Sequence, residues 1–282
     1  MTPPTPHQPG IVAQSTGPAL ADQLQETWAA LLDLCGPLTA AQWALPTDCP
    51  GWTVADQVAH IAGTEAMLAG RAAPPAPPGE PPPHVHNEIG RTNEAWLVHY
   101  RALGTGRLVA DLRALVSERL DRLRSMTEAE LDAPSWTPVG QATFRRFMQI
   151  RVFDCWTHEQ DVRLAIDRPG HLTGAAAEQA LDQVVQALGY IVGKLASAPA
   201  GSSVRFELPG PVTRTVLVAV GDRAEVVDHL DGPPATTIRM PSDILMRLAS
   251  GRSTATAHAT QVTIDGDVAL GQQIVDHLAF TI

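Results

Sequence analysis

The sequence predicts an α+β fold in two parts, a helical N-terminal domain over residues 21–170 and a small α+β domain over residues 171–282. Apolar residues recur at helical spacing in the first part, whereas short runs rich in β-branched residues follow one another beyond residue 200. With 282 residues, 44% of them hydrophobic, the chain is long and apolar enough to bury both cores.

The apolar spacing in the first part predicts helices over residues 22–35, 54–70, 87–103, 108–126 and 141–166. Thr53, followed three residues later by Asp56, is typical of a capping box and places the start of the second helix at Val54. The segment Arg168–Gly170 is expected to end the last of these helices.

Two proline-rich segments lie outside the helical pattern. Five prolines precede Ala19, and seven lie between Pro74 and Pro83. Such segments are extended and hydrated and form no core of their own. We expect the first to be a disordered tail over residues 1–20 and the second to be a surface loop between helices.

The pattern changes after residue 170. It predicts a helix over 174–196, strands over 203–208, 213–220 and 224–227, a short helix over 242–250, a strand over 261–264 and a last helix over 267–279. The three consecutive strands indicate an antiparallel meander, so the second domain is expected to have a mainly antiparallel sheet.

Charge and cysteine content exclude several classes of protein. Thirty acidic residues against 20 basic ones give a net charge of -10, which disfavours nucleic acid and anionic membranes as partners. Cysteine occurs only at Cys35, Cys49 and Cys155, too few for a disulfide framework, as is typical of a reducing compartment. Residues 1–20 show no signal-peptide pattern, and no apolar run reaches the roughly 18 residues of a membrane span. We therefore expect a cytoplasmic protein.

One face of the predicted 141–166 helix carries ionisable side chains beside an apolar stripe. At about 100° per residue, Phe147, Arg151, Asp154, His158 and Asp161 fall within roughly 80° of one another. Charges in such a position cost free energy unless they are paired or bound to a metal, so this face requires a partner.

Asp154 and His158 lie one helical turn apart and could offer two ligands to one metal ion. His60, on the second helix near the bundle interior, is the natural third ligand, which leaves a fourth position open for water or a thiolate. Asp161 could accept the other ring N–H of His158. Two alternatives stay open: an Asp154–His158 pair that only stabilises the helix, or a buried salt-bridge network without chemical purpose. Arg151 is expected to be the counter-charge of Asp154 and not a catalytic group.

Four segments carry a resemblance to a known family. PGWTVADQVAHIAG at 50–63 and RVFDCWTHEQDVRLAI at 151–166 resemble the mycothiol-dependent maleylpyruvate isomerase family, a branch of the DinB-like four-helix metalloproteins. MPSDILMRLASGR at 240–252 and VTIDGD at 262–267 are similar to the second domain of that family. The resemblance implies a DinB-like four-helix bundle followed by the small α+β domain.

The resemblance also implies a role for each residue of the polar face. His60, Asp154 and His158 match the metal ligands of the family, and Asp161 matches an aspartate that follows the last of them. Zinc is the expected ion, and mycothiol would bind as a thiolate because the cation lowers the pKa of the thiol. The family pattern has Glu at the position of Asp154, which leaves the particular reaction open.

In the chemistry that the resemblance implies, the thiolate adds to a small electrophile, such as maleylpyruvate. Expulsion of the thiol after rotation about the former double bond gives isomerisation, and retention of the thiol gives transfer. The partners expected are thus a small-molecule electrophile and a thiol, for a monomer or homodimer. The alternative is a non-catalytic metal- or small-ligand-binding protein of the DinB-like superfamily.

Carboxylates on the substrate or thiol favour arginine as a partner. The resemblance implies that the second domain supplies one, and of Arg239, Arg247 and Arg252 we favour Arg252, in its ASGR turn, as a catalytic residue beside Asp161. No residue is assigned to bind the thiol. Trp52 is expected to pack at the start of the second helix.

Overall fold

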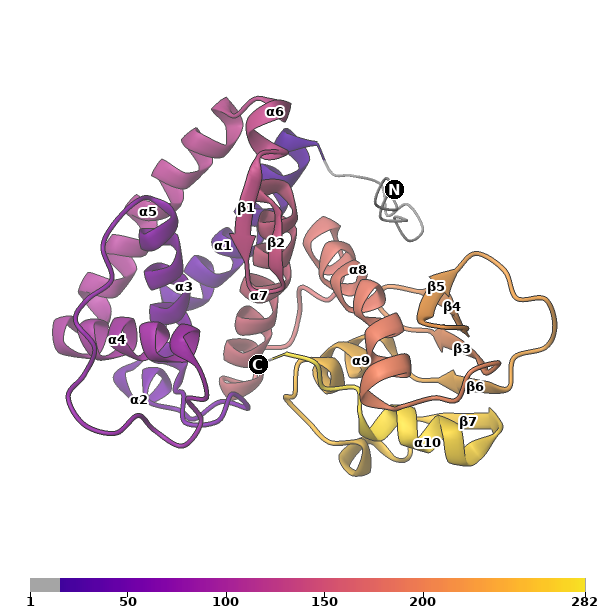
Figure 1. The fold of residues 1–282 in the computed structure, drawn as a ribbon. Coiled ribbons are helices and arrows are strands. Elements are labelled where there is room, and N and C mark those ends of the chain that lie inside the picture. The colour runs from indigo at the N-terminus through magenta and orange to yellow at the C-terminus, as the bar shows by residue number, and fades with distance from the viewer. Residues whose placement is uncertain (1–15, 282) are drawn as a thin grey trace. The chain divides into compact units, whose positions relative to one another are not determined.

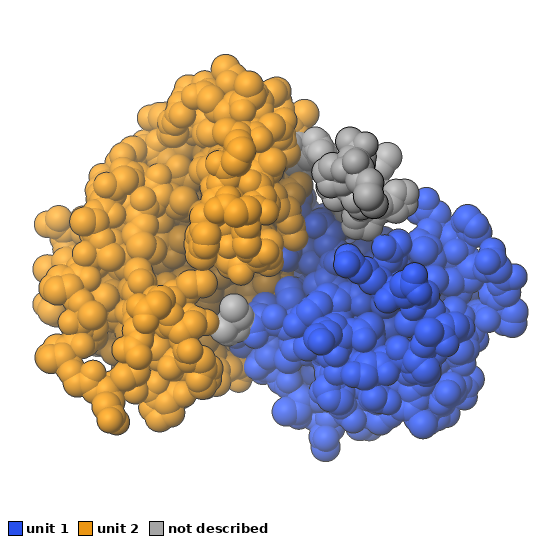
Figure 2. All heavy atoms as spheres, in the orientation of Figure 1, with its two compact units in different colours: residues 1–14, 172–282 blue, residues 15–171 orange. Residues whose placement is uncertain are grey.

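The computed structural model describes residues 16–281 and divides them into two compact units (Figures 1 and 2). Residues 16–171 form a helical unit, and residues 172–281 form an α+β unit. No helix among the described residues is long and apolar enough to cross a membrane.

The helical unit is built on four long helices. They are α1 (Gly17–Cys35), α3 (Val54–Leu68), α5 (Thr105–Ser125) and α7 (Phe144–Ala165). Helix α1 contacts α5 and α7, and α3 contacts the same two helices, so the four form a closed bundle. Its interior is apolar, with Trp28 and Met148 both fully buried. The predicted four-helix bundle is thus confirmed.

Five further elements complete this unit. They are α2 (Ala40–Trp43), α4 (Glu88–Leu103), which packs on α3 and α5, α6 (Glu128–Leu131), and the hairpin strands β1 (Pro134–Thr137) and β2 (Gly140–Thr143). The proline-rich segment 74–83 lies between α3 and α4 and contains no helix or strand, as predicted.

The capping box predicted at the start of α3 is present. The Thr53 hydroxyl accepts a hydrogen bond from the Asp56 N–H, and the Asp56 carboxylate accepts one from the Thr53 N–H at 2.9 Å. Arg101 of α4 donates to the same carboxylate at 2.8 Å. This cap fixes where α3 begins, and so fixes the position of His60 two turns later.

The predicted starts of the first and last bundle helices are wrong. Helix α1 begins at Gly17, so the predicted tail over 1–20 is too long; Thr16 caps the helix and Pro18 occupies its first turn, where no N–H is needed. Residues 1–15 of that tail lie outside the described residues. The last bundle helix begins at Phe144 and not at Gln141, because residues 134–143 pair as the β1–β2 hairpin and Thr143 then caps α7.

The second unit is an α+β domain with one five-stranded sheet. Its strands are β3 (Ser203–Leu208), β4 (Arg214–Val220), β5 (Ala224–Val227), β6 (Thr236–Arg239) and β7 (Thr263–Gly266), in the order β5-β4-β3-β6-β7. Its helices are α8 (Ala175–Tyr190), continued by a π-helical turn (Ile191–Leu195), α9 (Ser242–Ala249) and α10 (Val268–Asp276). Buried side chains such as Phe206 and Ile238 lie on the sheet.

The predicted antiparallel meander is confirmed for β3, β4 and β5. Strand β6 is absent from the prediction, and it pairs parallel with β3 and antiparallel with β7. The sheet is therefore mixed but mostly antiparallel. Four residues after a Gly/Pro-rich loop are too few to show an alternating pattern in the sequence, which explains why this strand was missed.

Candidate metal centre

Three side chains from two bundle helices converge inside the helical unit. His60 comes from the middle of α3, and Asp154 and His158 come from successive turns of α7. Both histidines are buried, whereas the Asp154 side chain is 30% exposed. The contact between α3 and α7 brings together residues that are 94 positions apart in the sequence.

The spacing of these donor atoms suits one metal ion. His60 Nε2 lies 3.2 Å from one carboxylate oxygen of Asp154, and His158 Nε2 lies 3.4 Å from the other. The three ligand atoms all lie within 4.8 Å of one another. Ligands about 2.1 Å from a tetrahedral zinc ion are about 3.4 Å apart, so this donor set fits such an ion.

Electrostatics keep two of these ligands in their metal-binding protonation states. Burial lowers the pKa of His60, although Asp154 opposes that shift, so the imidazole is neutral at pH 7. Desolvation acts to raise the pKa of Asp154, but the charge of Arg151 and the two imidazoles together hold it well below its usual range. Asp154 is thus a carboxylate at neutral pH.

A buried charge network surrounds Asp154. Arg151 donates to Asp154 through one guanidinium nitrogen and to Glu65 through another at 2.7 Å. Arg119 donates to the second oxygen of Glu65 at 3.0 Å. The predicted role of Arg151 as counter-charge of Asp154 is confirmed.

The Nδ1 side of His158 has a neighbour that the sequence analysis missed. Gln57, one turn before His60 on α3, places its Oε1 within hydrogen-bond distance of His158 Nδ1. The predicted partner, Asp161, places a carboxylate oxygen 3.5 Å from the same nitrogen. Gln57 is fully buried, and its position i−3 from His60 is the sequence signal that could have found it.

Trp52 lies against the candidate ligands. Its ring centroid is 5.6 Å from that of His158, nearly parallel to it, and 5.2 Å from that of His60. The indole N–H donates to the buried carboxylate of Glu94 on α4. Trp52 does pack at the start of α3, as expected, but it also forms an apolar wall of the candidate metal centre.

Two cysteine thiols of the bundle, those of Cys35 and Cys155, are unsuited to nucleophilic chemistry. Cys155 is buried on α7, and burial raises the pKa of its thiol to about 12, against a weaker opposing effect of Arg151. Burial likewise raises the pKa of Cys35 to about 12. Both side chains therefore belong to the core.

The predicted arginines lie in the second unit. Arg252 follows α9 and donates to the Ser250 carbonyl oxygen at 2.9 Å, and Arg239 on β6 pairs with Glu207. A contribution of Arg252 to the metal centre stays a prediction.

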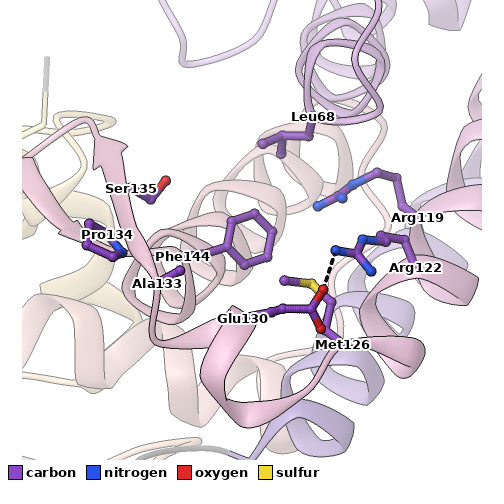
Figure 3. A pocket seen from close by; sticks show the side chains of 9 residues that line it. All are labelled: Leu68, Arg119, Arg122, Met126, Glu130, Ala133, Pro134, Ser135 and Phe144. Atoms are coloured by element: carbon purple, nitrogen blue, oxygen red, sulfur yellow. Dashed lines mark hydrogen bonds and ion pairs between the residues drawn. The ribbon is translucent and has the colours of Figure 1, made fainter.

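A pocket of about 380 Å³ lies elsewhere in the helical unit (Figure 3). Its lining residues are Leu68, Arg119, Arg122, Met126, Glu130, Ala133, Pro134, Ser135 and Phe144. None of the three candidate ligands lines it, so it is not the metal centre. Arg119 belongs both to this pocket, which it lines, and to the buried charge network around Asp154, in which it donates to Glu65.

Fold and site together define a class of protein: a four-helix bundle with a candidate two-histidine, one-carboxylate centre, joined to a small α+β domain. The family model of the mycothiol maleylpyruvate isomerase (MDMPI) N-terminal domain matches residues 24–163. The model of the MDMPI C-terminal domain matches residues 178–273. The chain belongs to the mycothiol maleylpyruvate isomerase family.

Two solved structures share this fold. One is the crystal structure of the mycothiol-dependent maleylpyruvate isomerase, 17% identical to this chain, and the other is a histidine-to-alanine mutant of that isomerase, 18% identical. Each match covers 90% of this chain and 95% of the other, with a TM-score of 0.57. No curated protein matches the chain in sequence.

Proposed function

We propose that this protein is a metal-dependent enzyme that uses a low-molecular-weight thiol, mycothiol, to isomerise or conjugate a small electrophile. A maleylpyruvate-like compound is one candidate electrophile. The observation that carries the proposal is the convergence of His60, Asp154 and His158 in a member of a family that includes a mycothiol-dependent isomerase.

In this proposal His60, Asp154 and His158 hold one divalent ion, zinc being the first candidate. Three protein ligands leave a coordination position for an exogenous ligand, as in catalytic zinc sites. When bound, the ion supplies a positive charge that lowers the pKa of a thiol, so that a thiolate forms at neutral pH. A small thiol in this role also accounts for a bundle whose own Cys155 is buried and protonated.

The surrounding residues prepare the site for this chemistry. Arg151 pairs with the same Asp154 oxygen that faces His60 and so holds the carboxylate in place, and Glu65 in turn holds Arg151. Trp52 covers the imidazoles with an apolar surface, which excludes water and strengthens electrostatic interactions near the ligands.

Two further residues have proposed roles. Asp161 would support the imidazole of His158 from its Nδ1 side. Arg252 would bind a carboxylate of the substrate or of the thiol, because a guanidinium grips a carboxylate through two parallel hydrogen bonds.

Replacing Asp161 by Asn tests the first role. The amide keeps the shape of the side chain but removes its charge, so we expect a loss of roughly 10-fold to 100-fold in zinc affinity, as for other groups that support a ligand. Competition with a chromogenic chelator measures that affinity. An unchanged affinity would remove Asp161 from the site.

The function itself is tested with zinc-loaded protein, mycothiol and a panel of electrophiles that includes maleylpyruvate. We expect turnover that requires mycothiol, is abolished in His60→Ala and is unchanged in His229→Ala, which replaces an exposed histidine of the second unit. Metal binding without any thiol-dependent turnover would contradict the proposal and favour the non-catalytic binding protein.

A further inference from the structure

We infer that Gln57, oriented by Thr47, is a positioning residue that sets which ring nitrogen of His158 carries the proton. The inference deepens the proposed function, because the proton on Nδ1 leaves Nε2 as the nitrogen that binds the metal. It follows from the direction of a chain of hydrogen bonds that starts at a main-chain carbonyl group.

The chain of hydrogen bonds starts in the turn before α3. The carbonyl oxygen of Trp52 can only accept, and the Thr47 hydroxyl donates to it at 2.9 Å. The Cys49 N–H donates to the same hydroxyl oxygen at 3.3 Å. The single hydrogen of the Thr47 hydroxyl is therefore committed, and its oxygen is left to accept.

This commitment orients the amide of Gln57. One end of that amide lies 2.6 Å from the Thr47 hydroxyl oxygen. Because the hydroxyl has no second hydrogen to offer, this end must be the NH₂ group, which donates. The other end, the Oε1 oxygen, then faces His158 Nδ1.

An amide oxygen accepts and cannot donate, so the facing Nδ1 of a neutral His158 must carry the hydrogen. The lone pair of the ring then lies on Nε2, the nitrogen 3.4 Å from Asp154 in the candidate metal centre. Gln57 is fully buried at 0% exposure, so water does not replace it as the acceptor. A ligand histidine whose other N–H is held in this way loses little freedom when the metal binds.

His60 provides the contrast. In the described part of the chain its Nδ1 is buried and has no hydrogen-bond partner. The two candidate histidine ligands therefore differ, and the removal of Gln57 is expected to affect His158 and not His60.

The test measures the tautomer and the metal affinity separately. Long-range ¹H–¹⁵N NMR of the metal-free protein, at a pH where the rings are neutral, is expected to show the proton of His158 on Nδ1. In Gln57→Leu that preference should be lost and zinc affinity should fall roughly 10-fold to 100-fold. Gln57→Glu keeps an acceptor at Nδ1 and should keep both the tautomer and most of the affinity.

Two further variants serve as checks. Gln183→Leu removes a buried glutamine of α8 in the second unit and should change neither readout. If Gln57→Leu fails to fold, Thr47→Val is used: it frees the amide to rotate, so the tautomer of His158 should become mixed.

A His158 protonated on Nε2 in the parent, or an Nδ1 tautomer that persists in the folded Gln57→Leu variant, would overturn the inference. The second result would assign the role to Asp161. The NMR measurement needs no metal, so the tautomer of His158 tests this inference by itself. Failure of the parent to bind zinc would instead contradict the proposed function.

Discussion

The guanidinium group of Arg151 lies between the carboxylates of Glu65 and Asp154, with only 3% of its side chain exposed. A charge so far from water is stable only because both neighbours are anionic. At the scale of single residues, the candidate site therefore depends on two groups, Arg151 and Glu65, that are not themselves candidate metal ligands.

Arg151→Met is expected to destabilise the fold strongly. The substitution keeps most of the apolar volume but leaves Glu65, 1% exposed, with Arg119 as its one remaining ion-pair partner among residues 16–281. Breaking a buried pair by removing one partner costs about 3–5 kcal/mol in the free energy of unfolding. Urea denaturation measures that loss.

The matched control is Arg71→Met. Arg71 pairs with Glu118, but the two side chains are 48% and 50% exposed, and surface pairs of this kind contribute about 0–1 kcal/mol. A similar loss of stability in both variants would contradict the account of the buried network.

At the scale of elements, the packing of α3 against α4 holds the helix that carries His60. Gly63, one turn beyond His60, lies against Trp96 of α4, which is 5% exposed. A Cβ atom at Gly63 would lie 2.6 Å from the Cβ of Trp96, well inside contact distance. The glycine thus allows the two helices to approach closely.

Gly63→Ala is therefore expected to destabilise the helical unit by about 1–3 kcal/mol, because the tryptophan cannot move away without disturbing the helix contact. Gly106→Ala is the control. Gly106 is the second residue of α5, and beyond its chain neighbours and its own helix backbone no described atom lies within 4 Å of its added Cβ, so alanine should stabilise slightly, by at most about 0.5 kcal/mol. Thermal unfolding of both variants checks the opposite signs.

The elements also show what a sequence can reveal. The start of α3 could be predicted because Thr53 and Asp56 act within one helical turn. The pairing of Trp136 with Gln141 in the β1–β2 hairpin could not, because each strand has only four residues. Asp154 and His158 were found from their spacing. Gln57 was missed because its role depends on a turn that folds back and places Thr47 beside it.

At the scale of the whole helical unit, His171 ties the first bundle helix to the last. Its ring contacts Glu159 of α7 at 2.6 Å and Glu26 of α1 at 2.9 Å, and its carbonyl oxygen accepts from Trp156. The hydrogen bond to Glu159 raises the pKa of His171 despite its partial burial, and Glu26 adds to that effect.

Stability of this unit is expected to depend on pH through His171. Because the pKa of His171 is raised in the folded state, protonated His171 stabilises the fold. Its contribution to the free energy of unfolding is fully present below the unfolded pKa of about 6.5 and is lost as the pH rises through the folded pKa. Tryptophan fluorescence follows this unit alone, because all six tryptophans precede residue 171.

Urea unfolding at pH 6 and pH 9 should show that decline in the parent but not in His171→Asn, because asparagine tolerates the positive φ of 55° at this position. His277→Asn, at an exposed histidine of the second unit, should behave as the parent. A decline of equal size in His171→Asn would assign it to other groups.

The most direct test of the central claim is the zinc content of protein purified without chelator and incubated with zinc, measured for the parent and for His60→Ala, His158→Ala and His229→Ala. We expect about one ion per chain in the parent and in His229→Ala, and almost none in the other two. An equal zinc content in all four proteins, or no bound zinc in the parent, would contradict a metal centre formed by His60, Asp154 and His158.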